Sequence, residues 1–211
     1  MKEGFVYNSV VPVTNEKPIS DLLGFSLENI KTFYDSEYNN SKQVSELALI
    51  LFRQLKVLHK LPRGYIKVLR IASILHDCGQ RIKFYDHERN SFHIILNSEV
   101  LGATHREIIL AAFVSASQNL SDFNLAEWIK YKDILTDEDL DAVRKLGIIV
   151  KLAVALNASR KAIVQDVVCD ILGDSIIMKT VVEGDASYEI LEGMKVAPDY
   201  KKVYKKSLQI I

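Results

Sequence analysis

The residues in this sequence that are best suited to chemistry are an adjacent histidine and aspartate, His76 and Asp77. They close the apolar run of residues 71–75 (Ile-Ala-Ser-Ile-Leu), and Cys78 and Gly79 follow them. An imidazole nitrogen and a carboxylate oxygen are both common ligands of divalent metal ions, and the apolar run places them at the end of a buried helix. The pair therefore predicts a candidate metal site inside the fold.

This pair resembles the core of the HD-type metal phosphohydrolases, and the resemblance implies two further ligands. One is a histidine from an earlier helix, where this sequence has Asn40, and the other is an aspartate after Lys-Leu-Ala in a later helix, where it has Val154. Valine has no lone pair, and hydrolytic metal centres use about three or more protein ligands. We therefore expect a degenerate metal site, with His76 and Asp77 kept as an inherited, hydrogen-bonded buried pair.

Three segments after the pair narrow the resemblance to one family. They are residues 84–91 (Phe-Tyr-Asp-His-Glu-Arg-Asn-Ser), 94–99 (Ile-Ile-Leu-Asn-Ser-Glu) and 102–107 (Gly-Ala-Thr-His-Arg-Glu). Together they resemble the C-terminal half of the exopolyphosphatase and guanosine pentaphosphate phosphatase (Ppx/GppA) family, and the similarity continues from Ser26 to the end of the chain. Asn90 is a further departure, because the family often has a second histidine there.

Histidines that match the family's positions leave an alternative open. His87 and His105 are candidates to join His76 and Asp77 as replacement ligands of a divalent metal. The chain would then be an atypical metal-dependent HD phosphohydrolase that acts on nucleotides or phosphomonoesters. The simpler interpretation is that both histidines are hydrogen-bonded residues at or near the surface.

The resemblance also implies what the chain lacks. In the family, phosphoanhydride cleavage takes place in two actin-like N-terminal domains with glycine-rich phosphate loops, a catalytic glutamate and Mg2+. The sequence here contains no strand-Gly-x-Gly-helix unit that would cradle a phosphate, and residues 1–7 resemble the last residues of the phosphatase half. We therefore expect an excised C-terminal half or a stand-alone paralogue that is not catalytic alone and has no cofactor of its own.

The function expected on these grounds is that of a regulatory, substrate-binding domain. We expect it to bind polyphosphate or pppGpp, to form a homodimer and to serve a catalytic actin-like half located elsewhere. A linear polyanion needs cations spaced along a groove, and the candidates are Lys60, Arg63, Lys67, Arg81, Lys83, Arg89, Arg106, Arg160 and Lys161. Two alternatives stay open: ordinary solvated helix faces, with Arg106 in a structural ion pair, or a dimerisation domain without a ligand.

The composition is that of a compact protein without a membrane segment. The 211 residues are 48% hydrophobic, enough for a substantial core, and no apolar run approaches the roughly 18 residues that span a bilayer. Lys plus Arg and Asp plus Glu each number 27, so no overall field attracts a polyanion, and no specific nucleic acid partner is expected. We expect a cytoplasmic protein in which Cys78 and Cys169 are reduced core thiols.

The elements that position these residues are predicted to be mainly α-helical. An extended lead segment or former interdomain linker (1–24) precedes an HD-like helical bundle (25–161). Ser26 is predicted to cap the first bundle helix, Asn39 or Asn40 the next, and Thr136 a long helix that ends near Asn157. Apolar periodicity predicts buried helices over residues 65–76 and 105–117, so the His76–Asp77 pair ends a central helix.

The C-terminal part of the sequence changes character. From residue 162 it becomes rich in β-branched residues, which predicts a hairpin over residues 163–172 and 175–182 around a Gly173-Asp174 turn. A helix over residues 186–195 and a short strand over 207–211 complete a small α+β appendage (162–211). This appendage is too small to bury much surface by itself, so we expect it to pack on the bundle.

Overall fold

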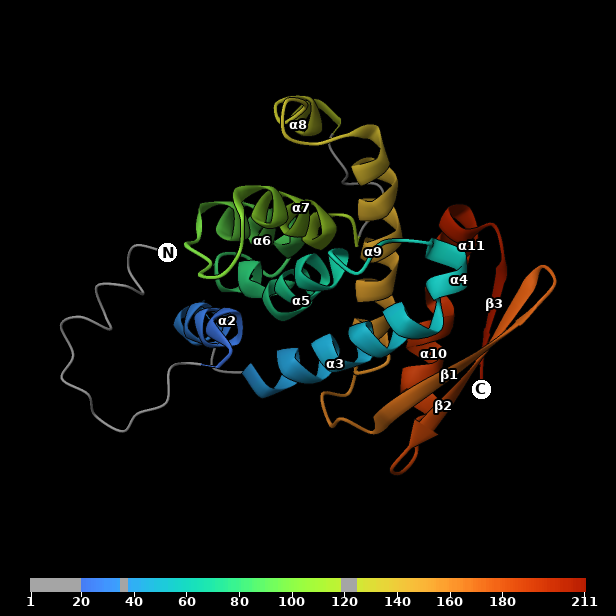
Figure 1. The fold of residues 1–211 in the computed structure, drawn as a ribbon. Coiled ribbons are helices and arrows are strands. Elements are labelled where there is room, and N and C mark those ends of the chain that lie inside the picture. The colour runs from blue at the N-terminus through green and yellow to red at the C-terminus, as the bar shows by residue number, and fades with distance from the viewer. Residues whose placement is uncertain (1–19, 35–37, 119–124) are drawn as a thin grey trace.

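The computed structural model describes residues 20–34, 38–118 and 125–211 (Figure 1). The chain is mainly helical, with a small three-stranded sheet near the C-terminus, as the sequence predicts. The bundle contains α2 (Leu22–Tyr34), α3 (Tyr38–Gln54), α4 (Lys56–His59), α5 (Tyr65–Leu75), the 3-10 helix η1 (Cys78–Arg81), α6 (His87–Asn97), α7 (His105–Ala116), α8 (Leu125–Ile129) and α9 (Asp137–Ala155). The appendage contains β1 (Val164–Leu172), β2 (Ser175–Val182), α10 (Ser187–Lys195), α11 (Ala197–Tyr204) and β3 (Ser207–Ile210). Within the described ranges, no helix is long and apolar enough to cross a membrane.

Helix α5 forms the centre of the bundle. It packs against α3 on one side and α7 on another, and α9 contacts all three of these helices. Every residue of α5 from Ile71 to Leu75 is buried, as its nearly continuous apolar sequence predicts. Because the C-terminal end of α5 is buried, the residues that follow it, His76 and Asp77, lie in the interior.

The first bundle helix starts earlier than predicted. Because α2 begins at Leu22, Ser26 lies inside the helix and is not its N-cap. Asp21 caps this end instead, since its carboxylate accepts a hydrogen bond of 2.9 Å from the Gly24 N–H. The buried Ser26 hydroxyl accepts a hydrogen bond from the Leu101 N–H, which ties α2 to the segment before α7.

The start of α3 also differs from the prediction. The helix begins at Tyr38, so Asn39 and Asn40 lie in its first turn rather than at its cap. Residues 1–19 of the predicted lead segment lie outside the described residues, and residues 22–24 already belong to α2. Helices α6 and α11 have no counterpart among the predicted elements; α11 has a proline in its first turn, where a missing N–H costs the helix nothing.

Helix α9 begins at the predicted cap. The Thr136 hydroxyl accepts a hydrogen bond of 3.3 Å from the Asp139 N–H, and the Asp139 carboxylate accepts one of 2.9 Å from the Thr136 N–H. This reciprocal pair is a capping box, and it satisfies two backbone donors that the first turn of a helix leaves free.

Loss of this cap has a measurable cost. We expect Thr136→Ala to lower the free energy of unfolding by about 1 kcal/mol, since the Asp139 N–H loses its side-chain acceptor and keeps only the Thr136 carbonyl. Urea denaturation followed by circular dichroism measures the change. Thr136→Ser keeps the hydroxyl and is the matched control; an equal loss in both variants would assign the effect to the threonine methyl group instead.

The appendage is joined to the bundle by polar contacts as well as by packing. Strands β1 and β2 are antiparallel, with Leu172 opposite Ser175 across the turn, and β3 runs parallel to β2. Helices α10 and α11 lie between α9 and the sheet (Figure 1). The Gln43 side chain donates a hydrogen bond of 2.9 Å to the Val164 carbonyl of β1, and the Tyr204 hydroxyl donates one of 3.0 Å to the Lys145 carbonyl of α9.

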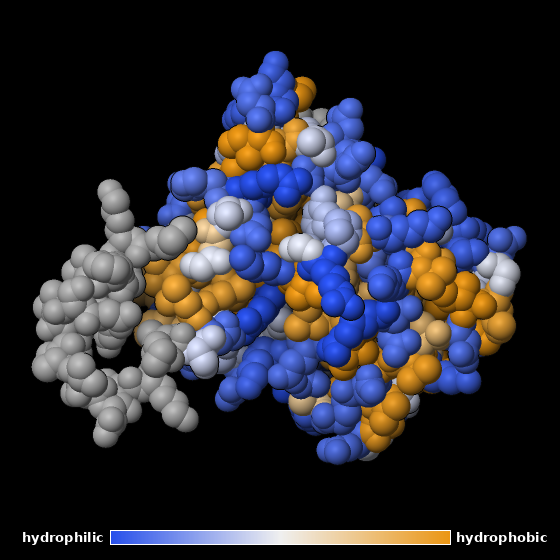
Figure 2. Space-filling model, viewed as in Figure 1, coloured by the Kyte–Doolittle hydropathy of each residue, from blue (hydrophilic) through white to orange (hydrophobic). Residues whose placement is uncertain are grey.

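The hairpin leaves apolar side chains at the surface. Figure 2 shows hydrophobic residues gathered over the hairpin, and the exposed ones include Val168, Leu172 and Val181. Nothing in the described part of the chain covers them. The ion pair between Lys179 and Asp170 lies among them on the same face of the hairpin. Exposed apolar side chains gathered in one region are often found at contact surfaces.

Candidate functional site

The His76–Asp77 pair lies in the turn between α5 and η1. His76 directly follows the last residue of α5, and Asp77 directly precedes η1. The two residues are 4% and 3% exposed. Both line a cavity of about 560 Å³ to which α3, α6, α9 and α10 also contribute. The pair therefore lies in the interior of the protein and borders the cavity.

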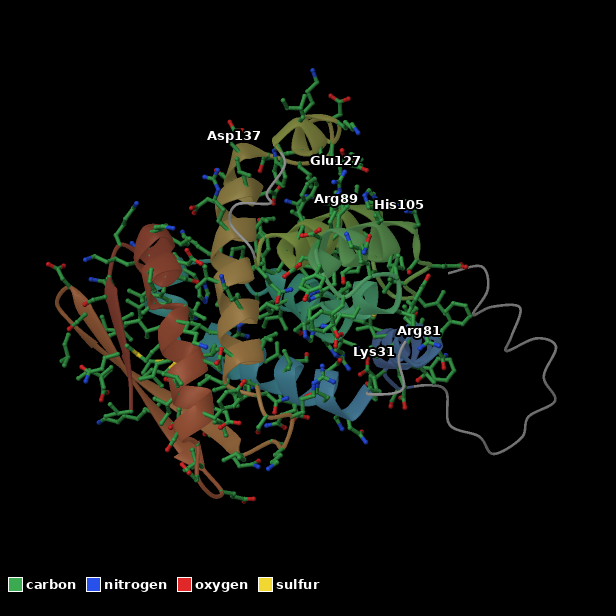
Figure 3. The ribbon with its side chains drawn as sticks, turned by 180° about the vertical axis from the view of Figure 1, so that it is seen from behind. Lys31, Arg81, Arg89, His105, Glu127 and Asp137 are labelled. Atoms are coloured by element: carbon green, nitrogen blue, oxygen red, sulfur yellow. The ribbon has the colours of Figure 1, made fainter. Side chains whose placement is uncertain are left out.

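A lysine from α2 reaches the aspartate. Lys31 Nζ lies 2.5 Å from Asp77 Oδ1, and the lysine side chain is completely buried (Figure 3). Burial opposes ionisation of Asp77, but the neighbouring His76 and the charge and hydrogen bond of Lys31 outweigh it, so the pKa of this carboxyl is lowered. Asp77 is therefore a carboxylate whose charge is balanced inside the protein.

The His76 imidazole is oriented by a backbone carbonyl. Its Nδ1 lies 2.8 Å from the Ser73 carbonyl oxygen, and because a carbonyl only accepts, Nδ1 carries the proton. Burial is the main cause that lowers the pKa of His76, so the ring is neutral at neutral pH and Nε2 holds a lone pair. With a neutral imidazole beside it, Asp77 takes its positive counter-charge from Lys31.

The two positions that would complete an HD centre offer no metal ligand in this geometry. Val154 lines the cavity with an alkyl side chain. Asn157 Nδ2 donates a hydrogen bond of 2.7 Å to Asn40 Oδ1, and Asn157 Oδ1 accepts one of 3.2 Å from the Ala162 N–H. These hydrogen bonds connect the first turn of α3 to the segment that follows α9. The side-chain oxygen of Asn40 therefore accepts a structural hydrogen bond.

The two candidate replacement histidines are separated by the fold. His87 lines the cavity together with His76 and Asp77, and its Nδ1 donates to the Phe84 carbonyl at 3.1 Å. His105 is exposed at the first residue of α7 and does not line the cavity (Figure 3). Among the described residues, no three His, Cys, Asp or Glu side chains converge as a metal site requires. With an ammonium already bound to Asp77, this donor set does not fit a divalent cation.

Two of the predicted basic residues are held by other groups. An Arg106 guanidinium nitrogen lies 2.5 Å from Asp139 Oδ1, so this arginine forms an ion pair across the starts of α7 and α9. Lys67 Nζ donates a hydrogen bond of 3.1 Å to the Gly102 carbonyl and lies 3.3 Å from the Glu107 carboxylate. Both cations connect elements of the bundle.

The other predicted basic residues lie in two regions. Lys60 and Arg63 are exposed beyond the C-terminal end of α3, a 17-residue helix about 25 Å long whose first turn faces the cavity. The second region adjoins the cavity, because Gln80, His87 and Glu88 of the η1–α6 segment and Arg160 after α9 line it. The exposed cations of this region are Arg81, Lys83, Arg89, Arg160 and Lys161.

Lys31 is the site residue that the sequence analysis missed. It follows the buried Leu23 by eight positions and the buried Leu27 by four, which is the spacing of one helix face. A lysine on a buried face must meet an anion inside the protein, because an unpaired buried charge is too costly. That spacing was the available signal.

The described residues define a mainly helical domain. In it, the aspartate of a buried His-Asp pair forms an ion pair with a buried lysine. A comparison with protein-family models matches residues 24–186 to domain III of the Ppx/GppA phosphatases, and the chain belongs to this family. The family predicted from the segments between residues 84 and 107 is therefore confirmed. A search of curated proteins gave no match.

Proposed function

We propose that this chain is a non-catalytic, polyanion-binding domain of an exopolyphosphatase-like protein, which holds polyphosphate or pppGpp for a catalytic actin-like half. The contact that carries the proposal is the 2.5 Å ion pair between Lys31 and Asp77. A carboxylate neutralised by a buried ammonium is a poor ligand for a hydrolytic metal ion, and Asn40 and Val154 supply no replacement. In this proposal the His76–Asp77 pair is a degenerate HD site, and Mg2+ chemistry belongs to the catalytic half.

The binding surface we propose is the η1–α6 segment at the edge of the cavity. Arg81, Lys83 and Arg89 are exposed there, and Figure 3 shows Arg81 and Arg89 on the same side of the bundle as Lys31. Lys83 is held only loosely, 3.8 Å from Asp86. Several exposed cations on one segment are the kind of charge that a linear polyanion needs for binding. The exposed apolar side chains of the hairpin support the further proposal that the chain forms a homodimer. A cytoplasmic location is part of the same proposal.

Charge removal at this surface tests the proposal. We expect the triple variant Arg81→Gln, Lys83→Gln, Arg89→Gln to bind fluorescently labelled polyphosphate about tenfold more weakly than the unaltered protein, since exposed charge pairs contribute about 0.5 kcal/mol each. Fluorescence anisotropy at low and physiological salt measures the affinity. The affinity of the unaltered protein should fall more steeply with salt than that of the variant.

A second triple variant is the matched control. Lys56→Gln, Lys60→Gln and Arg63→Gln remove the same charge from exposed residues at the far end of α3, and this protein should bind like the unaltered one. Equal weakening in both variants would mean diffuse attraction and no site at η1–α6. Metal-dependent release of phosphate from a nucleotide, abolished by His76→Ala, would favour the alternative of an atypical HD phosphohydrolase.

A further inference from the structure

Two exposed aromatic residues lie among the cations of the η1–α6 segment. The Phe84 and Tyr85 side chains are 68% and 75% exposed, in the turn between η1 and α6. Their rings lie edge to face, with centroids 5.6 Å apart and planes at 89°. By contrast, Phe92 and Phe113 are buried and pack against each other in the core. The Phe84 and Tyr85 rings contribute little to the core and are accessible to a ligand.

The backbone that carries the two rings is anchored on both sides. The Lys83 N–H donates a hydrogen bond of 3.1 Å to the Gly79 carbonyl, which holds the turn to η1. His87 Nδ1 donates one of 3.1 Å to the Phe84 carbonyl, which holds the turn to α6. A ligand that binds an anchored turn orders less of the chain than one that binds a loose segment, so less entropy is lost on binding.

The charge of this segment is modest for a ligand that is bound by charge alone. Arg81, Lys83 and Arg89 are exposed cations. The carboxylates of Asp86 and Glu88 belong to the same segment, and that of Asp86 lies 3.8 Å from Lys83. One exposed charge contact changes an affinity by about twofold. Stacking of a nucleobase on an aromatic ring changes it by about tenfold to a hundredfold. A ligand that has a base as well as phosphates therefore gains more here than a chain of phosphates.

We infer that Phe84 and Tyr85 form a base-stacking site, which makes the η1–α6 surface selective for nucleoside polyphosphates over inorganic polyphosphate. The base lies against one of the two perpendicular rings, and Arg81 and Lys83 bind the phosphates. An aromatic ring stacks on any base, so this site distinguishes a nucleotide from bare polyphosphate but not guanine from adenine. The inference rests on the proposed polyanion-binding surface and specifies the class of its ligand.

Competition against fluorescently labelled polyphosphate tests the inference, with GTP and inorganic tripolyphosphate as competitors. Both competitors have three phosphates, and only GTP has a base. With the unaltered protein, GTP should displace the label at a concentration about tenfold lower than tripolyphosphate does, and ATP should compete like GTP. In the double variant Phe84→Ala, Tyr85→Ala, GTP and tripolyphosphate should compete equally to within about twofold, because only phosphate contacts remain.

Two further variants assign the effect to the aromatic faces. Phe25→Ala with Phe33→Ala removes two exposed rings from α2, where the one basic residue is the buried Lys31, and should leave the preference for GTP unchanged. Phe84→Leu with Tyr85→Leu keeps apolar side chains without aromatic faces and should lose the preference. The leucine variant also takes the place of the alanine variant if the latter does not fold.

The outcomes separate this inference from the proposed function. Equal competition by GTP and tripolyphosphate on the unaltered protein overturns the inference, although binding of the labelled polyphosphate still supports the polyanion-binding surface. A preference for GTP that survives in the Phe84→Ala, Tyr85→Ala variant also overturns it, as does an equal loss in the α2 control. If the unaltered protein does not bind labelled polyphosphate, the proposed function fails together with the inference. Loss of the preference in the Phe84 and Tyr85 variants alone supports the base-stacking site.

Discussion

Gly79→Ala is expected to lower the free energy of unfolding by about 3 kcal/mol, because η1 touches α6 at this residue with no room for a side chain. A Cβ atom on Gly79 would lie 2.1 Å from the His87 carbonyl oxygen and 2.5 Å from the Ser91 nitrogen. Both are backbone atoms, which cannot rotate away as a flexible side chain can. The Gly79 N–H also donates a hydrogen bond of 2.9 Å to the Ser91 hydroxyl, and an outward shift of η1 would break it.

Urea denaturation of Gly79→Ala and Gly64→Ala measures this effect against a matched substitution. Gly64 precedes α5, and no atom lies within 4 Å of the place of its Cβ, so we expect its replacement to change stability by less than about 0.5 kcal/mol. The contrast is informative because both substitutions add one methyl group. Equal stability of Gly79→Ala and Gly64→Ala would contradict this expectation. It would mean that η1 can move away from α6 at little cost, and that the turn with His76 and Asp77 is less rigid than the close contact at Gly79 indicates.

Elements with strong local signals were predictable from the sequence. The predicted helix over residues 65–76 matches α5, because its residues are apolar on almost every face, and Thr136 caps α9 through the predicted side chain. The hairpin matches because β-branched residues flank a Gly-Asp turn. In each case the information lies within a few residues of sequence.

The errors arise where the decisive contact is distant or unusual. Ser26 has the chemistry of an N-cap, but its hydroxyl bonds to the segment before α7, and Asp21 takes the cap. Helix α11 was not predicted, although the proline in its first turn is compatible with a helix. Local pattern identifies residues that can cap or break a helix, and tertiary contacts decide which of them do.

The same distinction applies to the candidate site. The sequence predicted that His76 and Asp77 end a buried helix, and the structure confirms this position. It did not reveal Lys31, because the partner of Asp77 is 46 residues away on a helix whose docking angle no local pattern specifies. The basic residues also looked equivalent in sequence, yet the fold uses Arg106 as a bridge to Asp139 and leaves Arg89 exposed.

Asp77→Ala is expected to lower the free energy of unfolding by about 3–5 kcal/mol at neutral pH, since it leaves the Lys31 ammonium buried without this carboxylate. The two possible roles of Asp77 predict different stability costs for this substitution. Loss of the counter-ion of Lys31 is costly, whereas loss of a metal ligand that holds no metal would cost little. The double variant Lys31→Met, Asp77→Leu removes both charges and fills the space with apolar atoms. It should recover most of the loss, as hydrophobic replacements of buried ion pairs commonly do.

The pH dependence gives an independent test of the same ion pair. Since the pKa of Asp77 is lowered in the folded protein, its ionised form stabilises the fold above its ordinary pKa of 3.8, and this contribution is lost as the pH falls through the lower, folded-state pKa. The stability difference between the unaltered protein and Asp77→Ala should therefore be constant from about pH 7 to about pH 5 and narrow below about pH 4. Urea denaturation at several pH values measures that difference directly. A difference that vanished already near neutral pH would mean that Asp77 is protonated in the fold, and Lys31 could not then be its counter-ion.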